Sequence, residues 1–153
     1  MGAVLEKTAK SVNAVAHLGD GWEDIHELMR KHPDLPLFAV TGNCDYGSGP
    51  NSLTFRFASK KFIMTHGYRY YVKSDYLRIC LWAEENQADV CLFGHTHVPD
   101  VFYAGSTLML NPGSIGAPRG QGAASYGIVD VSETGVVDGR VMGVKGGALK
   151  RLL

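Results

Sequence analysis

Residues 90–97 read Val-Cys-Leu-Phe-Gly-His-Thr-His, a short apolar run that ends in two histidines separated by one residue. An apolar run of this length closed by a glycine is typical of a buried strand. In α/β proteins, ligands bind beyond the carboxyl ends of such strands. In a loop at that position, the imidazoles of His95 and His97 could both turn toward one metal ion or two. The stretch therefore favours a metal site at the end of a strand.

Three other apolar runs also end in short polar clusters. Residues 14–18 lead into Gly19-Asp20, residues 37–40 into residues 41–45, and residues 62–64 into residues 65–67. Taken singly, a Gly-Asp or Asn-x-Asp pair is usually a turn, because these side chains cap their own backbone, and a lone strand-end histidine usually has an ordinary hydrogen-bond partner. Their recurrence at four strand ends favours a shared site instead. The candidate metal ligands are Asp20, Asn43, His66, His95 and His97.

The remaining histidines fit the pattern less well. His26 and His32 lie on or at the end of a predicted surface helix, where we expect solvated side chains, and His17 lies inside an apolar strand and is expected to point elsewhere. Residues 111–114, Asn-Pro-Gly-Ser, are either a plain turn or a brace for the histidine loop. Arg119 is either a solvated loop arginine or a contact for an anionic substrate.

Composition indicates one domain, residues 1–153, with a sizeable core. The formal net charge is zero, which argues against general nucleic-acid binding or capture by a membrane surface. No apolar run approaches the roughly 20 residues that span a bilayer, and residues 1–10 contain no signal-peptide core. The three cysteines show no paired spacing, which predicts reduced thiols and a cytoplasmic location.

The hydrophobic pattern predicts an α/β fold in which two sheets pack face to face with helices outside. Expected helices cover residues 3–11, 22–31 and 74–87, the last with Ser74 as N-cap and with Leu77, Cys80, Leu81 and Ala83 facing the core. Expected strands cover residues 14–18, 37–41, 53–58, 61–64, 89–93, 101–103, 107–110, 126–131 and 136–144. The two expected strands at residues 53–58 and 61–64 form a predicted hairpin.

The ordered set of clusters at residues 19–20, 42–45, 65–67, 94–97 and 111–114 resembles the calcineurin-like metallophosphoesterase superfamily. It is most similar to the small bacterial and archaeal phosphodiesterase branch, which includes the retromer scaffold subunit. The resemblance implies a four-layer αββα sandwich of two mixed sheets. It also implies one or two divalent ions (manganese, iron, nickel or zinc) at the strand ends, and hydrolysis of small-molecule phosphoesters by a metal-bound hydroxide.

The resemblance also implies roles for individual residues. Asp20 would bridge two ions; Asn43, His66 and His95 would complete one site, and His97 would belong to the other. Catalytic candidates are Asn43, Cys44 and Asp45, with Cys44 at a place where many members have a histidine. Tyr68 and Arg119 are candidates for substrate contact, and Tyr68 stands where the branch often has a second histidine.

The chain departs from the family pattern in one larger respect. Residues 1–19 contain no Asp-x-His, the motif that ends the first family strand and binds the first ion. We therefore expect that strand to be missing, the first site to keep only Asp20 and His97, and an apolar sheet edge near residues 14–18. A second copy in a homo-oligomer, or rearranged N-terminal residues, would cover that edge. Two functions stay open: a phosphoesterase whose start lies upstream of Met1, and a non-catalytic binding module of the same fold.

Overall fold

The computed structural model describes residues 2–46, 49–120, 122–145 and 148–151, and it confirms an α/β fold with mixed sheets and few helices. The main sheet has five strands in the order β3-β4-β5-β7-β6. The inner pairs β4–β5 and β5–β7 are parallel, and the outer strands β3 and β6 are antiparallel to their neighbours. These strands are β3 (Ser52–Phe57), β4 (Lys60–Thr65), β5 (Val90–Phe93), β6 (Pro99–Ala104) and β7 (Thr107–Pro112).

The remaining strands form two smaller sheets rather than the single second sheet expected from the sequence. β1 (Val15–His17) pairs in parallel with β2 (Leu37–Ala39). β8 (Ser125–Val131), β9 (Val137–Lys145) and β10 (Ala148–Arg151) form an antiparallel sheet in the order β10-β9-β8. Within the described residues no strand hydrogen-bonds β1 to this antiparallel sheet, so the two units stay separate. Covering of the β1 edge by a second copy stays a prediction.

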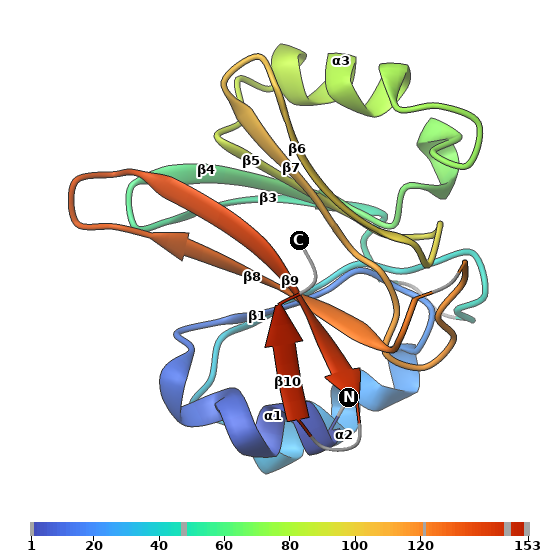
Figure 1. Cartoon of the computed structure of the whole chain (residues 1–153), viewed down its shortest axis with the longest axis vertical. Coiled ribbons are helices and arrows are strands. Elements are labelled where there is room, and N and C mark those ends of the chain that lie inside the picture. The colour runs from blue at the N-terminus through green and yellow to red at the C-terminus, as the bar shows by residue number, and fades with distance from the viewer. Residues whose placement is uncertain (1, 47–48, 121, 146–147, 152–153) are drawn as a thin grey trace.

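The helices lie on both sides of the strands. Figure 1 shows α3 (Leu77–Glu85) on one side, and α1 (Gly2–Thr8) and α2 (Trp22–Lys31) on the other. Two short 3₁₀ turns, η1 (Ala9–Ser11) and η2 (Tyr68–Tyr70), complete the helical elements. None of the helices among the described residues has the length and apolarity required to cross a bilayer.

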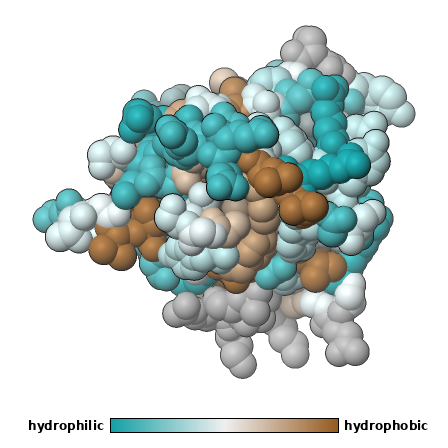
Figure 2. Space-filling model, turned by 90° about the horizontal axis from the view of Figure 1, so that it is seen from above, coloured by the Kyte–Doolittle hydropathy of each residue, from teal (hydrophilic) through white to brown (hydrophobic). Residues whose placement is uncertain are grey.

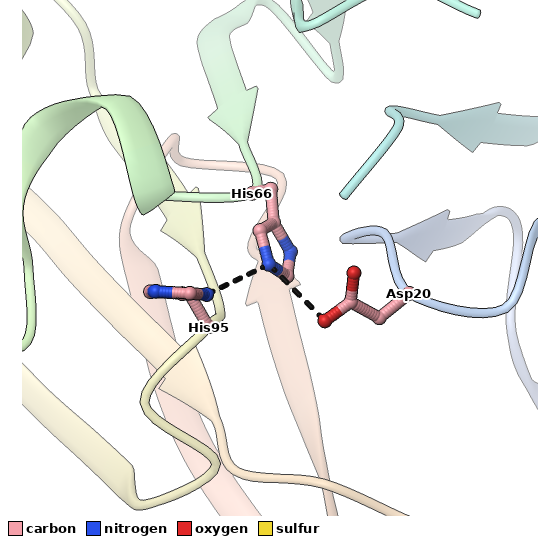
Figure 3. A group of neighbouring side chains, drawn as sticks. All are labelled: Asp20, His66 and His95. Carbon is pink, nitrogen blue, oxygen red and sulfur yellow. Dashed lines mark hydrogen bonds and ion pairs between the residues drawn. The ribbon is translucent and has the colours of Figure 1, made fainter. Parts of the chain in front are cut away.

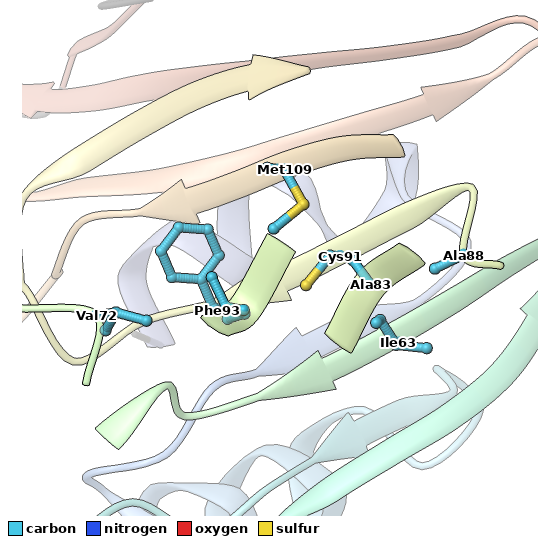
Figure 4. Packing of buried hydrophobic residues seen from close by; sticks show 8 residues of the cluster. Ile63, Val72, Ala83, Ala88, Cys91, Phe93 and Met109 are labelled. Carbon is cyan, nitrogen blue, oxygen red and sulfur yellow. The ribbon is translucent and has the colours of Figure 1, made fainter. Parts of the chain in front are cut away.

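The main sheet separates two hydrophobic cores. On the α3 side, Ile79 of the helix packs among Ile63, Cys91, Phe93 and Met109 of the strands, the packing seen in Figure 4. On the opposite face, alternate strand residues such as Met64, Leu92 and Leu110 form a second cluster with Val40 and partly buried residues of β8 and β9. All four residues of β5 are buried because both faces of this central strand are covered. That burial fixes where β5 ends and where its histidine loop begins.

Helix α3 differs from the sequence prediction in its start and in the face that it buries. It begins at Leu77, so Ser74 is not its N-cap; instead the Asp75 carboxylate accepts the N–H of Leu77 at 2.9 Å. Leu77 and Leu81 were predicted to face the core, but they are 65% and 48% exposed. Ala83 is buried as predicted, and Cys80 is partly buried against the core, whereas Ile79, which was not predicted, is buried in addition.

Candidate metal centre

Four strand-end loops meet at one place. Asp20 follows β1, Asn43 follows β2, His66 follows β4 and His95 follows β5. β1 and β2 run parallel, as do β4 and β5, so within each pair the carboxyl ends lie at the same edge. Figure 3 shows the His66 ring between the His95 ring and the Asp20 carboxylate. The fold thus brings together four of the five predicted metal ligands.

The contacts centre on one nitrogen, Nε2 of His66. It lies 3.0 Å from His95 Nδ1, 3.1 Å from Asn43 Oδ1 and 3.4 Å from Asp20 Oδ2. The opposite ring nitrogen of His66, Nδ1, lies 2.6 Å from the Leu18 carbonyl oxygen, so it carries the proton and donates. The Asn43 and Asp20 oxygens are acceptors, and in a neutral ring with its proton on Nδ1, Nε2 is an acceptor as well. A proton on His95 Nδ1 could satisfy only one of them.

Such a convergence of acceptor atoms fits a bound cation. A carboxylate oxygen, an amide oxygen and imidazole nitrogens are ordinary ligands of divalent transition metals. Among His, Cys, Asp and Glu of the described residues, the ligand atoms of Asp20, His66 and His95 all lie within 4.8 Å of one another. The amide oxygen of Asn43 adds a fourth donor through its contact with His66. The donor set therefore fits the metal that the sequence predicted.

The imidazole of His95 is held in the neutral form that a metal requires. Burial, followed by the neighbouring His66 and Lys73, lowers the pKa of His95 to about 4, although the Asp20 charge opposes this. His66 is only 4% exposed, and its Nδ1–H is committed to the Leu18 carbonyl. The His95 ring therefore has no proton to lose at pH 7 before it coordinates a cation.

Asp45 holds two of the loops together. Its Oδ2 accepts the N–H groups of Asp20 and Gly42 at 2.8 and 2.7 Å, and its Oδ1 accepts those of Gly21 and Trp22 at 2.7 and 2.9 Å. Burial by itself would raise the pKa of Asp45, but these four donors lower it to about 2. The carboxylate is thus engaged with the backbone and positions Asp20; a part for Asp45 in the chemistry stays a prediction.

The loops approach each other so closely that only glycine fits at two positions. A Cβ on Gly42 would lie 2.1 Å from Asp20 Oδ1, and one on Gly19 would lie 2.5 Å from the Gly42 nitrogen. Gly19 has a φ of +93°, whereas Asp20, His95 and His97 adopt left-handed φ values of 58°, 69° and 61° without being glycine. Left-handed non-glycine residues cluster at functional sites, where the surrounding contacts hold them.

Asn111 braces the histidine loop, as one of the two interpretations of residues 111–114 predicted. This fully buried side chain donates from Nδ2 to the Gly94 carbonyl at 3.1 Å and to Thr96 Oγ1 at 2.9 Å. Its Oδ1 accepts the N–H of Gly113 at 3.0 Å. Two of these bonds fall on the residues before and after His95, so Asn111 sets the course of that loop.

The other predicted site residues lie around this centre. His97 is not part of the Asp20–His66–His95 group; its Nδ1 lies 2.7 Å from the Ala117 carbonyl oxygen. The backbone N–H of Arg119 donates to the His97 carbonyl at 3.1 Å, so Arg119 lies on the His97 side of the site. Their roles stay predictions.

Two exposed residues flank the four ligands. The Cys44 N–H donates to Asp20 Oδ1 at 2.9 Å, and its Sγ accepts from Asn43 Nδ2 at 3.3 Å. The Tyr68 ring lies edge-on to the His95 ring, with centroids 5.9 Å apart. His17, as expected, is not a member of the ligand group. The sequence did not single out Arg69, the residue next to Tyr68, because no motif marks it.

An α/β fold with mixed sheets and an Asp-Asn-His donor set at its strand ends is the arrangement that the metallophosphoesterase resemblance implied. The chain belongs to the calcineurin-like phosphoesterase superfamily, since the profile of that superfamily domain matches residues 1–134. It is 36% identical over 128 residues to the probable metallophosphoesterase YsnB of Bacillus subtilis, covering 82% of this chain and 73% of that protein.

Two further comparisons agree. The phosphodiesterase YfcE of Escherichia coli is 30% identical over 117 residues, which cover 71% of this chain and 57% of that protein. A crystal structure of a conserved uncharacterized protein from Streptococcus pneumoniae matches with a TM-score of 0.75 and 31% identity, over 97% of this chain and 86% of that one. The chain thus spans little more than half the length of YfcE.

Proposed function

We propose that this chain is a metal-dependent phosphoesterase that hydrolyses small-molecule phosphodiesters. The observation that carries the proposal is the convergence of Asp20 Oδ2, Asn43 Oδ1 and His95 Nδ1 on His66 Nε2. The superfamily and the name of the Escherichia coli relative support the choice of phosphodiesters. Helices on both sides of the strands support the four-layer sandwich of that superfamily.

In this proposal Asp20, Asn43, His66 and His95 hold one divalent ion, which is manganese, iron, nickel or zinc. When bound, such an ion polarises a phosphoryl oxygen and lowers the pKa of water. The chain's own residues place the substrate: Cys44 and Tyr68 border the ligands, and Arg119 reaches from the loop that contacts His97. His97 would offer its Nε2 to a second ion, together with Asp20, because its Nδ1 lies against the Ala117 carbonyl oxygen.

The proposal is tested by metal content and turnover measured on the same samples. The purified chain is loaded with Mn²⁺, and the bound metal is counted after gel filtration. Hydrolysis of bis(p-nitrophenyl) phosphate is then followed. We expect bound Mn²⁺ and metal-dependent turnover, both lost in His95→Ala and both kept in the control His26→Ala, whose histidine is exposed on α2.

The outcomes separate the two functions that the sequence left open. Turnover that disappears with His95 supports the phosphoesterase. Metal binding without turnover supports a non-catalytic module of this fold. Failure to bind Mn²⁺, Fe²⁺, Ni²⁺ or Zn²⁺ would overturn the metal centre itself.

A further inference from the structure

A polar hollow opens directly beside the metal ligands, on the side of His66 that faces Tyr68. Its volume is about 110 Å³. Space of roughly 10–15 Å³ suffices for one water molecule, so the hollow has room for several waters or for a small polar group. It is lined by Thr41, Gly42, Asn51, Thr65, His66, Gly67, Tyr68 and Arg69.

Arg69, an exposed residue, is the one lysine or arginine among the residues that line this hollow. The residues that line it include no carboxylate, so no acidic group there neutralises the guanidinium. Among the described residues, none of the salt bridges involves Arg69. Arginine presents a planar set of N–H donors that matches carboxylate and phosphate oxygens.

The backbone that carries Arg69 is anchored on both sides. Gly67 adopts a left-handed φ of +100°, which turns the chain immediately after His66. The Tyr70 N–H donates to the Gly67 carbonyl at 3.0 Å, and the Tyr70 ring packs on Trp82 of α3 with centroids 4.9 Å apart. Val72 beyond it is only 3% exposed. Arg69 therefore projects from a turn fixed to the core, which reduces the cost of ordering it around a ligand.

We propose that Arg69 is a specificity-determining residue that selects phosphoesters bearing a second anionic group next to the phosphate held at the metal centre. This inference rests on the proposed function, and it names the substrate class of that site. The phosphate would lie at Asp20, Asn43, His66 and His95. The second phosphate or carboxylate would lie in the hollow beside His66, where Arg69 donates to it and Thr41 and Thr65 form part of the wall.

A pair of ligands that cannot be hydrolysed tests this without turnover. Methylphosphonate carries one anionic group, and phosphonoacetate adds a carboxylate; both contain a C–P bond. Their affinities for the Mn²⁺-loaded chain are measured by calorimetry, with free Mn²⁺ held constant, for the original chain, Arg69→Gln and Arg78→Gln. Arg78 is an exposed arginine that lies over the Tyr71 ring and does not line the hollow.

We expect phosphonoacetate to bind at least about fivefold more tightly than methylphosphonate, a difference that a charge-assisted hydrogen bond can supply. Arg69→Gln should abolish this preference for phosphonoacetate, and Arg78→Gln should preserve it. A ratio near one in the original chain, or an undiminished ratio in Arg69→Gln, would overturn the inference. A chain that binds both ligands with the expected ratio but hydrolyses nothing would contradict the proposed function alone.

Discussion

At the scale of single residues, the centre depends on which nitrogen of His66 carries a proton. The sequence indicated that His66 follows a strand, and that position makes it a candidate ligand. It could not indicate that the Leu18 carbonyl would lie 2.6 Å from Nδ1, because the two residues are 48 positions apart. The same holds for Asp45, whose four backbone donors come from residues 20–22 and 42. Ligand identity is thus readable from local pattern, whereas ligand orientation depends on contacts between distant loops.

His17 provides a prediction at this scale. It is 8% exposed, and its Nδ1 accepts the Gly19 N–H at 3.2 Å. Burial lowers its pKa below 6.5 in the folded chain, although Asp45 and Asp24 oppose the shift. As pH falls below 6.5, the unfolded chain therefore binds a proton before the folded chain does, and the free energy of unfolding decreases. One such group contributes a slope of at most about 1.4 kcal/mol per pH unit.

We expect His17→Asn to reduce this slope, since asparagine can keep the acceptor for Gly19 but does not titrate. The measurement is urea unfolding of the metal-free chain from pH 8 to pH 5, followed by tryptophan fluorescence. His26→Asn, at an exposed position on α2, is the control and should keep the full slope. Equal slopes in the original chain and in His17→Asn would show that His17 does not titrate differently on folding.

At the scale of secondary-structure elements, strands were easier to predict than helix faces. The hairpin β3–β4 was expected from alternation, and it forms around Ala58 and Ser59, both with positive φ, at 46° and 65°. Alternation needs only neighbouring residues, so it is visible in the sequence. The buried face of α3 was predicted correctly at Ala83 and wrongly at Leu77 and Leu81, because these two are as apolar as Ile79 and only docking against β5 selects among them. β10 was missed because its residues, Ala-Leu-Lys-Arg, lack a strand pattern.

β7 contributes to the centre through Asn111, which carries the prediction at this scale. Asn111→Ala removes three hydrogen bonds; it takes the Asn111 partner from the Gly113 N–H and leaves the Gly94 carbonyl with the Thr96 N–H alone. We expect the free energy of unfolding to fall by about 2 kcal/mol. We also expect Mn²⁺ affinity to fall about tenfold or more, as is usual when a residue that orients a ligand is lost. Calorimetric titration with Mn²⁺ and urea unfolding measure the two effects.

Asn86→Ala separates loss of stability from loss of the site. Asn86 donates from Nδ2 to the Trp82 carbonyl at 2.8 Å at the end of α3. Its removal should lower stability modestly and leave Mn²⁺ affinity unchanged. If Asn111→Ala also kept full affinity, Asn111 would stabilise the sheet without positioning His95.

At the scale of the whole molecule, the centre joins the carboxyl ends of β1 and β2 to those of β4 and β5, which belong to separate sheets. The sequence predicted the strand ends but not how the sheets would face each other, since that depends on packing across both cores. The surface offers less to interpret. Figure 2 looks onto the α3 side and shows apolar residues in small patches among hydrophilic ones, which is ordinary for a protein surface.

A cation bound between separate sheets should stabilise the entire fold, and Cys91 can report this. Cys91 is fully buried between β4, β7 and α3, and burial raises the pKa of its thiol, so alkylation requires the core to open. Mn²⁺ at 100 times its dissociation constant stabilises the folded chain by about 2.7 kcal/mol. When closing is faster than alkylation, labelling of Cys91 should therefore slow about 100-fold.

The measurement is alkylation with iodoacetamide, with each cysteine followed by peptide mass spectrometry. A small free thiol added to every sample controls for reagent activity; exposed Cys44 is not used for this, because it borders the metal ligands Asp20 and Asn43. In His95→Ala, the same Mn²⁺ concentration should leave the Cys91 rate unchanged, since the site has lost a ligand. If Mn²⁺ binds but Cys91 labels at the metal-free rate, then the α3 core opens while the strand-end loops stay together. The metal would in that case hold the loops without stabilising the sheet behind them, and site and core would be separate cooperative units.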